Sequence, residues 1–139
     1  MNILKILTPK RIIGNFGEKT AQKYLKKNGY KILETSYIAF GAEIDIIAKK
    51  DNVIAFIEVK TRTVSDFPCI EERPSSAVTP EKQRKIIRAA SDYITRNPGE
   101  HYNRFDVIEV YTRLDGTRRR LLQVMHLENT FDKNTAYRK

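Results

Sequence analysis

The chain has 139 residues, a length at which one domain can bury its own hydrophobic core. Its composition, 40% hydrophobic and 31% charged, is typical of globular proteins and excludes disordered, collagenous and low-complexity classes. The 26 Lys and Arg residues outnumber the 17 Asp and Glu residues, and the net charge of +9 favours nucleic acid as a partner. The alternative is that the positive charge only maintains solubility.

The sequence contains no candidate membrane segment, and we expect a cytoplasmic protein. Its longest unbroken apolar stretch, residues 53–57, is far shorter than the ~20 residues of a membrane-spanning helix. Residues 1–11 lack the apolar core of a signal peptide. A single cysteine, Cys69, excludes an intrachain disulfide and a zinc site built from several cysteines, which suits a reducing compartment.

The first half of the chain is predicted to form a helix and three strands. Residues 12–28 place apolar side chains at helical spacing and end at an Asn-Gly pair that is typical of a helix end. Strands are predicted over 30–37, 43–49 and 53–62, and the turn between the last two makes them a hairpin. Residues 63–78, rich in proline and serine, are predicted to be a long functional or mobile loop.

The second half is predicted to contain one helix and two strands. Thr79 is the expected N-cap, Pro80 the first helical residue, and an Asn-Pro-Gly sequence the helix end. Strands over 102–112 and 119–127 are expected to form a hairpin around an Asp-Gly turn. This order predicts an α/β fold with helices flanking a central mixed sheet. We expect one domain over residues 1–139, with its core at about 12–131 and a mobile tail at 132–139.

The residues with chemical potential concentrate in the first predicted hairpin. Symmetric pairing about the turn at 51–52 places Asp45 opposite Glu58 and Glu43 opposite Lys60. Two opposed carboxylates repel each other unless a cation lies between them, and their oxygens are ligands that suit Mg²⁺ or Mn²⁺. This pattern is typical of phosphodiester chemistry. The alternative is an edge-strand charge pattern that discourages aggregation.

A third acidic residue and two histidines lie outside this hairpin. Glu18 is at the margin of the core-facing side of the first helix and can point toward the sheet; the alternative is an acidic residue favoured by the helix dipole. His101 and His126 are isolated in the sequence and are predicted to be surface or packing residues. Glycine-rich phosphate loops, nucleophile elbows and His-Glu-x-x-His zinc motifs are absent from the sequence.

Glu18 on a helix, Asp45 on a strand and Glu58-Val59-Lys60 on the next strand resemble the motifs of the PD-(D/E)xK, or restriction-endonuclease-like, nuclease superfamily. A wider set of residues resembles the YraN-like family, a small bacterial family related to the archaeal-type Holliday junction resolvases. This set, which extends from about residue 14 to 131, comprises Gly14, Gly17-Glu18, Ala21, Tyr24-Leu25, Gly29-Tyr30, Glu43-Ile44-Asp45, residues 58–62, Lys82, Ala90, Tyr93 and residues 104–107. The family's usual Gly-Glu-Ile-Asp motif here carries an additional residue, Ala42.

The resemblance implies a three-layer α/β/α restriction-endonuclease-like core. It implies Glu18, Asp45 and Glu58 as metal ligands and Lys60 as the catalytic lysine. By analogy with the resolvases, it also suggests a homodimer, because a two-fold symmetric junction offers two equivalent strands to cut.

The leading hypothesis is therefore a Mg²⁺- or Mn²⁺-dependent endonuclease that hydrolyses phosphodiester bonds in DNA, including branched or junction DNA. Lys60 is expected to remain charged beside the carboxylates and to stabilise negative charge on the phosphate rather than act as a base. Contacts to the nucleic-acid backbone are expected from Arg62, Lys82, Lys85, Arg88 and Arg119, with solvated or snorkelling side chains as the alternative. Two other hypotheses are a noncatalytic nucleic-acid-binding module with a nuclease-like fold and a structural interaction protein with a fortuitous acidic hairpin.

Overall fold

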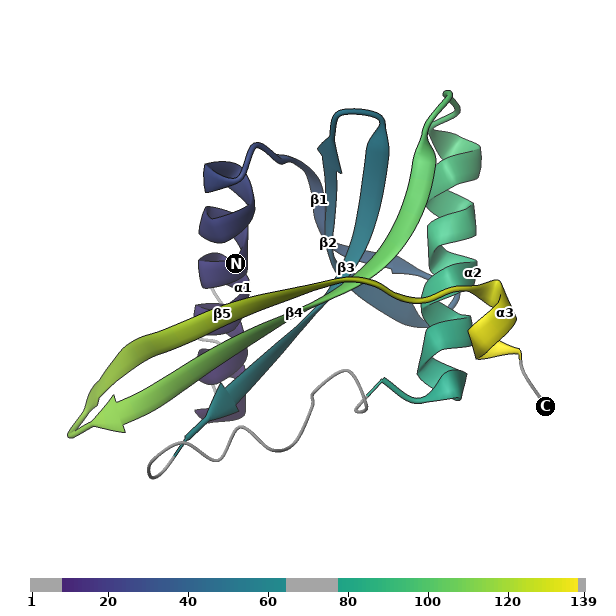
Figure 1. Cartoon of the computed structure of the whole chain (residues 1–139). Coiled ribbons are helices and arrows are strands. Elements are labelled where there is room, and N and C mark those ends of the chain that lie inside the picture. The colour runs from purple at the N-terminus through teal and green to yellow at the C-terminus, as the bar shows by residue number, and fades with distance from the viewer. Residues whose placement is uncertain (1–8, 65–77, 138–139) are drawn as a thin grey trace, which may run out of the picture.

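Five strands form a single mixed sheet with helices on both faces, in a computed structural model that describes residues 9–64 and 78–137 (Figure 1). The strands, which follow one another across the sheet in chain order, are β1 Lys31–Ala39, β2 Ala42–Lys50, β3 Val53–Thr63, β4 Tyr102–Asp115 and β5 Arg118–Phe131. The helices are α1 Pro9–Lys27, α2 Pro80–Arg96 and α3 Lys133–Ala136. The predicted three-layer α/β architecture and element order are confirmed, and α3 is an additional short helix.

The connections between the strands explain how they pair. Short turns join β1, β2 and β3, which pair antiparallel, as do β4 and β5. β3 and β4 pair parallel, which requires a crossover connection, and α2 lies within it. The central strand β3 is covered on both faces and therefore has a run of buried residues rather than a strict alternation.

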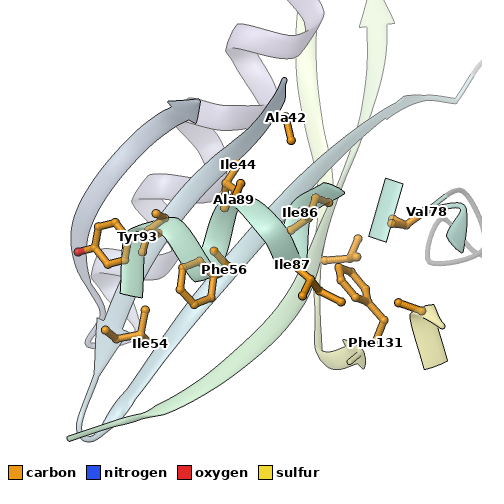
Figure 2. Packing of buried hydrophobic residues seen from close by; sticks show 14 residues of the cluster. Ala42, Ile44, Ile54, Phe56, Val78, Ile86, Ile87, Ala89, Tyr93 and Phe131 are labelled. Atoms are coloured by element: carbon orange, nitrogen blue, oxygen red, sulfur yellow. The ribbon is translucent and has the colours of Figure 1, made fainter. Parts of the chain in front are cut away.

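α1 and α2 cover opposite faces of the sheet, and each closes its own hydrophobic core (Figure 1). The core beneath α1 consists of Ala21, Leu25, Tyr30, Ile46, Ala48, Ala55, Ile57, Ile108 and Val110. Beneath α2, the predicted apolar stripe packs on the other face of the sheet; Figure 2 labels Ile86, Ile87 and Tyr93 of this stripe together with Ile54 and Phe56 of β3. The two helices thereby fix the sheet from both sides.

The start of α2 is determined locally. Thr79 has extended backbone angles, and its hydroxyl accepts a hydrogen bond from the backbone N–H of Lys82 at 3.2 Å. Pro80 occupies the first helical position, where its missing N–H costs nothing. The predicted N-cap is thus confirmed, and it fixes the first turn of α2 at the side of the sheet where β2 and β3 carry their acidic residues.

Part of the expected mobile tail is a helical turn. Asp132 caps α3 through a hydrogen bond from the backbone N–H of Thr135 at 3.0 Å, and Arg84 of α2 donates to the carbonyl oxygen of Ala136 at 2.7 Å. Ala136 is fully buried, so this turn packs on α2. Of the predicted loop 63–78, residues 65–77 lie outside the described residues, as do residues 138–139 of the tail.

In the described part of the chain, no helix has both the length and the apolar character needed to cross a membrane.

Candidate functional site

β2 and β3 pair in the predicted register from their turn as far as Ile46 and Ile57, and then they separate. The next predicted pair, Asp45 with Glu58, is not part of the ladder. Instead, the backbone N–H of Val59 donates to Oδ2 of Asp45 at 2.8 Å. The strands therefore open at the position where the sequence places the two carboxylates, and a side chain takes over from the backbone ladder.

β2 also changes face at Asp45. Ile44 packs in the core beneath α2, whereas Ile46 packs in the core beneath α1. Residues two apart share a face in a regular strand, so the strand twists sharply between them. The β1–β2 pairing omits Asp45 and the residue opposite it, Ser36, which has a left-handed φ of 50°. This irregularity also removes the predicted pairing of Glu43 with Lys60.

The opening of the strands lies between two clefts that share Asp45 and Glu58 in their walls. The cleft on the α1 side, of about 520 Å³, is also lined by Glu18 and Lys60. The cleft on the α2 side, of about 410 Å³, is lined by Glu43, Lys82 and Lys85 among others. All four predicted catalytic residues, Glu18, Asp45, Glu58 and Lys60, therefore line one cleft.

Neighbouring carboxylates in these clefts raise the pKa of Asp45 and of Glu18, because their negative charges disfavour further ionisation. Burial, followed by the charge of Glu58, raises the pKa of Asp45 from 3.8 to about 7, although the hydrogen bond from Val59 opposes the shift. Burial also raises the pKa of Glu18, and the charges of Glu43 and Glu58 add to the effect. The clefts thus concentrate negative charge that a bound cation would neutralise.

Two lysines approach the same oxygen of Glu58, whose side chain is only 7% exposed. Nζ of Lys82 donates to Oε1 of Glu58 at 2.8 Å, and Nζ of Lys60 lies 3.7 Å from that oxygen. Burial lowers the pKa of Lys82, but the hydrogen bond and the charge of Glu58 outweigh burial, and the net shift is upward.

The charge of Glu58 favours the protonated form of Lys60, as predicted, but it is not the largest influence on the pKa of this lysine. Burial is the largest influence and lowers the pKa of Lys60. The charge of Glu58 opposes this shift, whereas the charges of Lys82 and Arg62 add to it. The prediction considered only the nearby carboxylates, and the tertiary structure adds burial and a second lysine from α2.

A divalent cation fits a site with two protein carboxylates better than one with three. Among residues 9–64 and 78–137, no three His, Cys, Asp or Glu side chains are grouped closely enough to hold a metal ion together. Mg²⁺ is commonly held by one or two carboxylates, with waters and substrate phosphates completing its shell. Asp45 and Glu58 supply such a pair, and Glu18 lines the same cleft.

The basic residues predicted on α2 have different surroundings. Lys82 contacts Glu58, so its ammonium group lies at the carboxylates. Lys85 is exposed and lies 3.8 Å from Glu81 in a surface ion pair. The Arg88 guanidinium lies over the ring of Phe40, 5.1 Å from its centroid. Of these three residues, Lys82 and Lys85 line the α2-side cleft.

The two basic residues predicted on strands lie near the end of β3. Arg62 is exposed there. Arg119 of β5 donates to the hydroxyls of Thr63 at 3.1 Å and Thr112 at 2.7 Å. Arg119 thus connects the β4–β5 hairpin to the end of β3, and Thr63 lines the α1-side cleft.

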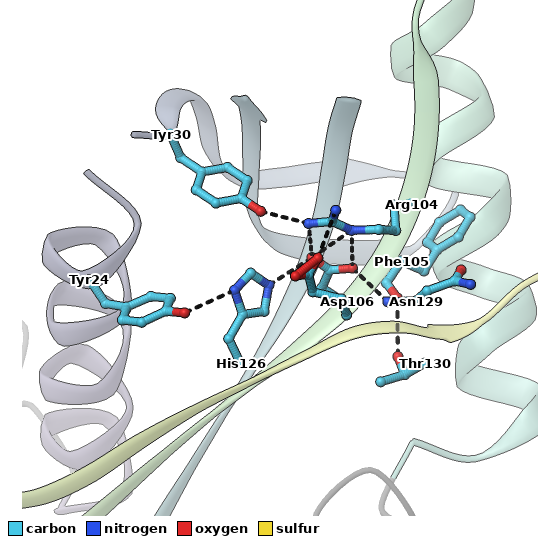
Figure 3. Close-up of polar contacts among 9 residues, drawn as sticks. Tyr24, Tyr30, Arg104, Phe105, Asp106, His126, Asn129 and Thr130 are labelled. Carbon is cyan, nitrogen blue, oxygen red and sulfur yellow. Dashed lines mark hydrogen bonds and ion pairs between the residues drawn. The ribbon is translucent and has the colours of Figure 1, made fainter. Parts of the chain in front are cut away.

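A buried polar network on β4 and β5 was missed from the sequence (Figure 3). Asp106 is fully buried and accepts hydrogen bonds from Arg104 at 2.8 to 3.1 Å and from the backbone N–H of Asn129 at 2.9 Å. Nε2 of His126 lies 2.7 Å from Oδ2 of Asp106, and the buried His126 side chain is a packing residue, as predicted, within a polar network. Arg104 also donates to the hydroxyl of Tyr30 at 2.7 Å.

This network extends to the helix that carries Glu18. The hydroxyl of Tyr24, on α1, lies 3.3 Å from Nδ1 of His126. Arg104 and Asp106 lie two residues apart on β4 and therefore share a face, which is the only part of the network that strand periodicity could have indicated. The partners on α1 and β5 depend on tertiary packing.

Glu109 is a second buried acid that sequence reasoning missed. It is 2% exposed, accepts a hydrogen bond from the hydroxyl of Tyr111, and is paired with Lys60 in the parallel β3–β4 register. Its position within an apolar stretch of β4 indicated a buried residue, but the parallel register that places it beside Lys60 is set by the crossover through α2.

A protein-family model matches the greater part of the chain. Residues 17–110 match the uncharacterised protein family UPF0102. The chain belongs to UPF0102. It is 45% identical over 123 residues to a UPF0102 protein of Caldanaerobacter subterraneus, a match that covers 88% of this chain and 96% of the relative. The matched segment contains the four predicted catalytic residues in the α1-side cleft, and the predicted membership of an uncharacterised bacterial family is confirmed at this level.

Two further relatives cover similar shares of both chains. A UPF0102 protein of Flavobacterium psychrophilum is 38% identical over 119 residues, which cover 86% of this chain and 92% of the relative. A UPF0102 protein of Clostridium beijerinckii is 40% identical over 123 residues, which cover 88% of this chain and 94% of the relative. These names carry no activity, and the placement of the chain in the nuclease superfamily stays a prediction.

Proposed function

We propose that this UPF0102 protein is a restriction-endonuclease-like, metal-dependent endonuclease that hydrolyses phosphodiester bonds in DNA in the cytoplasm. The observation that carries the proposal is the opening of β2 and β3, which leaves Asp45 and Glu58 in one cleft with Glu18 and Lys60. One buried and one half-buried carboxylate beside a lysine form a donor set suited to a hard divalent cation and a phosphate.

Each residue has a distinct role in this proposal. Asp45 and Glu58 hold Mg²⁺ or Mn²⁺, which when bound activates water and neutralises charge on the phosphate. Glu18 accepts a hydrogen bond from a water in the same cleft, where its carboxylate faces the same concentration of negative charge. Lys60 stabilises the negative charge that develops on the phosphate, because Glu58 at 3.7 Å supports its protonated form against the effect of burial.

A basic hairpin beside the cleft supports nucleic acid as the substrate. We call residues 112–121, which form the outer end of β4 and β5, the β4–β5 arm; it projects beyond the helices alongside the end of β3 (Figure 1). The arm carries Arg113, Arg118, Arg119 and Arg120 against one acidic residue, Asp115. Through Arg119 and Thr63 the arm is connected to the wall of the α1-side cleft. Phosphate contacts on this arm would hold a strand next to the carboxylates.

The decisive test is a cleavage assay with end-labelled single-stranded, duplex, flap and four-way-junction DNA, and with RNA, in Mg²⁺ and in Mn²⁺. The wild type, Glu58→Ala and Glu100→Ala are purified in parallel, because Glu100 is an exposed acidic residue in the turn before β4. We expect metal-dependent cutting of DNA by the wild type and Glu100→Ala and none by Glu58→Ala. Equal cutting by all three proteins would reveal a contaminating nuclease and contradict the assignment.

A noncatalytic nucleic-acid-binding module is the second candidate, and one observation favours it. Lys82 and Lys60 both approach Oε1 of Glu58, so that this carboxylate is neutralised by the chain itself. A protein of this kind would bind DNA with strong salt dependence and cut none of the substrates in either metal. The same assay, with binding measured alongside, separates the two candidates.

A further inference from the structure

The ion pair between Lys82 and Glu58 joins the start of α2 to the candidate cation site. The backbone of Lys82 is fixed in the first turn of α2 by its hydrogen bond to Thr79. Its side chain is 42% exposed and reaches across the cleft to the buried carboxylate of Glu58 at 2.8 Å. Lys82 is therefore fixed at its backbone and has a flexible, partly solvated stem.

An ammonium group and a divalent cation compete for the same oxygen of Glu58. With Nζ of Lys82 at 2.8 Å from Oε1, a cation coordinated by that oxygen would lie within a few ångströms of a positive charge, which is strongly repulsive in a partly buried cleft. At Asp45 the donor is instead the neutral backbone N–H of Val59. A cation must therefore displace Lys82 in order to coordinate Oε1 of Glu58 together with Asp45.

Lys60 is less suited to leave Glu58 than Lys82. Its Nζ lies 3.7 Å from Oε1, beyond hydrogen-bonding distance, and its backbone is paired with Glu109 in the centre of the sheet. Lys82 lies on the helix side of the cleft near Lys85, and its side chain, 42% exposed, can turn toward solvent. A displaced Lys82 would present its charge to whatever anion accompanies the cation.

We propose that Lys82 competes with a divalent cation for Glu58 and, once displaced, binds a phosphate of the nucleic acid. The inference rests on the proposed function, because it takes Asp45 and Glu58 as the cation site and a phosphodiester as the anion. Lys82 thereby couples the two ligands: cation binding frees a phosphate-binding group, and phosphate binding removes a competitor of the cation. By thermodynamic linkage, each ligand then strengthens the other by the same factor.

The first arm of the test measures Mn²⁺ affinity by calorimetry on chelator-treated protein without nucleic acid. Lys82→Gln removes the competing charge and is expected to lower the Kd for Mn²⁺ about tenfold. Lys82→Arg restores the charge and should return the Kd to within about threefold of the wild type. Arg96→Gln is the matched control, because Arg96 also carries a positive charge on α2 but lies at the far end of the helix and pairs with Asp92; its Kd should stay within about twofold of the wild type.

The second arm measures coupling. The affinity for a nuclease-resistant phosphorothioate duplex is measured by fluorescence anisotropy with and without saturating Mn²⁺. We expect Mn²⁺ to tighten duplex binding about tenfold in the wild type and by less than about threefold in Lys82→Gln. This readout does not depend on cleavage.

The outcomes separate this inference from the proposed function. If Mn²⁺ binds the wild type but not Glu58→Ala, and Lys82→Gln leaves the Kd unchanged, competition by Lys82 is disproved while the cation site stands. If neither the wild type nor Lys82→Gln binds Mn²⁺, the cation site and the inference both fall. A tighter Kd in Lys82→Gln with undiminished coupling would overturn the assignment of Lys82 to phosphate.

Discussion

The regular β2–β3 ladder ends before Asp45, and the candidate site begins at this residue. Its carboxylate accepts the backbone N–H of Val59, so a side chain replaces the backbone partner that β2 would otherwise supply. The cost is a half-buried carboxylate beside Glu58, and burial, followed by the charge of Glu58, raises the pKa of Asp45 to about 7. A cation bound there, as proposed, would offset this cost.

Removing one carboxylate should abolish the response of the protein to metal. We expect millimolar Mn²⁺ or Mg²⁺ to raise the melting temperature of the wild type, because a ligand that binds only the folded state stabilises it. Asp45→Ala should melt at the same temperature with and without metal. Differential scanning calorimetry checks this prediction, with Asp115→Ala, on the exposed hairpin turn, as the control that keeps the full response. A metal response that survives in Asp45→Ala would contradict the role of Asp45.

A second residue-scale prediction concerns Asp106. Burial opposes ionisation of this carboxylate, but hydrogen bonds from His126, Arg104 and the N–H of Asn129 outweigh burial and lower its pKa below the ordinary 3.8. An acid with a lowered folded-state pKa stabilises the protein above the unfolded-state pKa, and this contribution is lost as the pH falls through the folded-state pKa.

Asp106→Asn should therefore lower the free energy of unfolding by about 3 kcal/mol at pH 7, the order of magnitude for breaking a buried ion pair. The difference from the wild type should be constant at neutral pH and narrow only below about pH 3.8, where the wild-type carboxylate begins to lose its advantage. Urea unfolding from pH 3 to pH 7 measures it. A difference that disappears near pH 6 would mean that another group carries the interaction.

At the scale of elements, the contact of α1 with β3 decides where Glu18 lies. Gly17 is the closest point of that contact: a Cβ added there would lie 1.8 Å from Oγ1 and 3.0 Å from Cβ of Thr61. Thr61 follows Lys60 directly, so any movement of the helix away from β3 changes the relation of Glu18 to the carboxylates. Gly14, one turn earlier on α1, has no atom within 4 Å of an added Cβ.

The two glycines should therefore respond oppositely to the same substitution. Gly17→Ala is expected to destabilise the fold by about 1 to 3 kcal/mol, because rotating Thr61 relieves the contact with Oγ1 but not that with Cβ. Gly14→Ala should stabilise it by about 0.5 to 1 kcal/mol through higher helix propensity. Chemical denaturation gives both values, and Gly17→Ala should also lose cleavage activity. Equal stabilisation by both variants would show that α1 is not closely packed at Gly17.

At the scale of the whole molecule, charge and shape are unevenly distributed. The acidic side chains meet where β2 and β3 separate, whereas arginines cluster on the β4–β5 arm. The excess positive charge, +9 in total, is therefore not spread evenly over the protein surface. A basic projection beside an acidic cleft suits the proposed function, in which the arm would bind the polyanion and the carboxylates would receive one phosphate.

Neutralising the arm should reduce the salt dependence of DNA binding. For Arg113→Gln/Arg118→Gln, we expect the slope of log K against log salt concentration to become less steep by about 2, because each removed arginine leaves roughly one phosphate without its neutralising charge. Lys26→Gln/Lys27→Gln, at the exposed end of α1, is the matched control and should keep the wild-type slope. Fluorescence anisotropy over a salt series measures these slopes. Identical slopes in both double variants would place the DNA elsewhere on the molecule.

The expected action on branched or junction DNA is tested by the assembly of the protein. A two-fold symmetric junction presents two equivalent strands, and a homodimer would offer two equivalent clefts. We expect sedimentation velocity to give a dimer at micromolar concentration. A monomer at that concentration, combined with cleavage of linear duplex, would favour a substrate without two-fold symmetry.

The elements, their order and most of the β2–β3 register could be predicted from the sequence. These depend on local information: the apolar periodicity of each segment, the turn at 51–52 and the cap at Thr79. The register predicted from that turn holds as far as Ile46 and Ile57, because each ladder pair constrains the next one. Glu18, Asp45, Glu58 and Lys60 could be named from the hairpin register together with the resemblance to the nuclease motifs, and they line one cleft.

The contacts of these residues, in contrast, depend on the tertiary structure and could not be predicted from the sequence. Glu58 and Lys82 are far apart in the sequence, and Asp106 meets His126 through the pairing of β4 with β5. The end of the β2–β3 ladder at Asp45 likewise depends on the twist that β1 and β2 share at Ser36. Periodicity reports which face a side chain occupies, whereas its partner and its burial depend on which elements pack against that face. For this reason, burial and the charge of Lys82 outweigh the predicted effect of Glu58 and lower the pKa of Lys60.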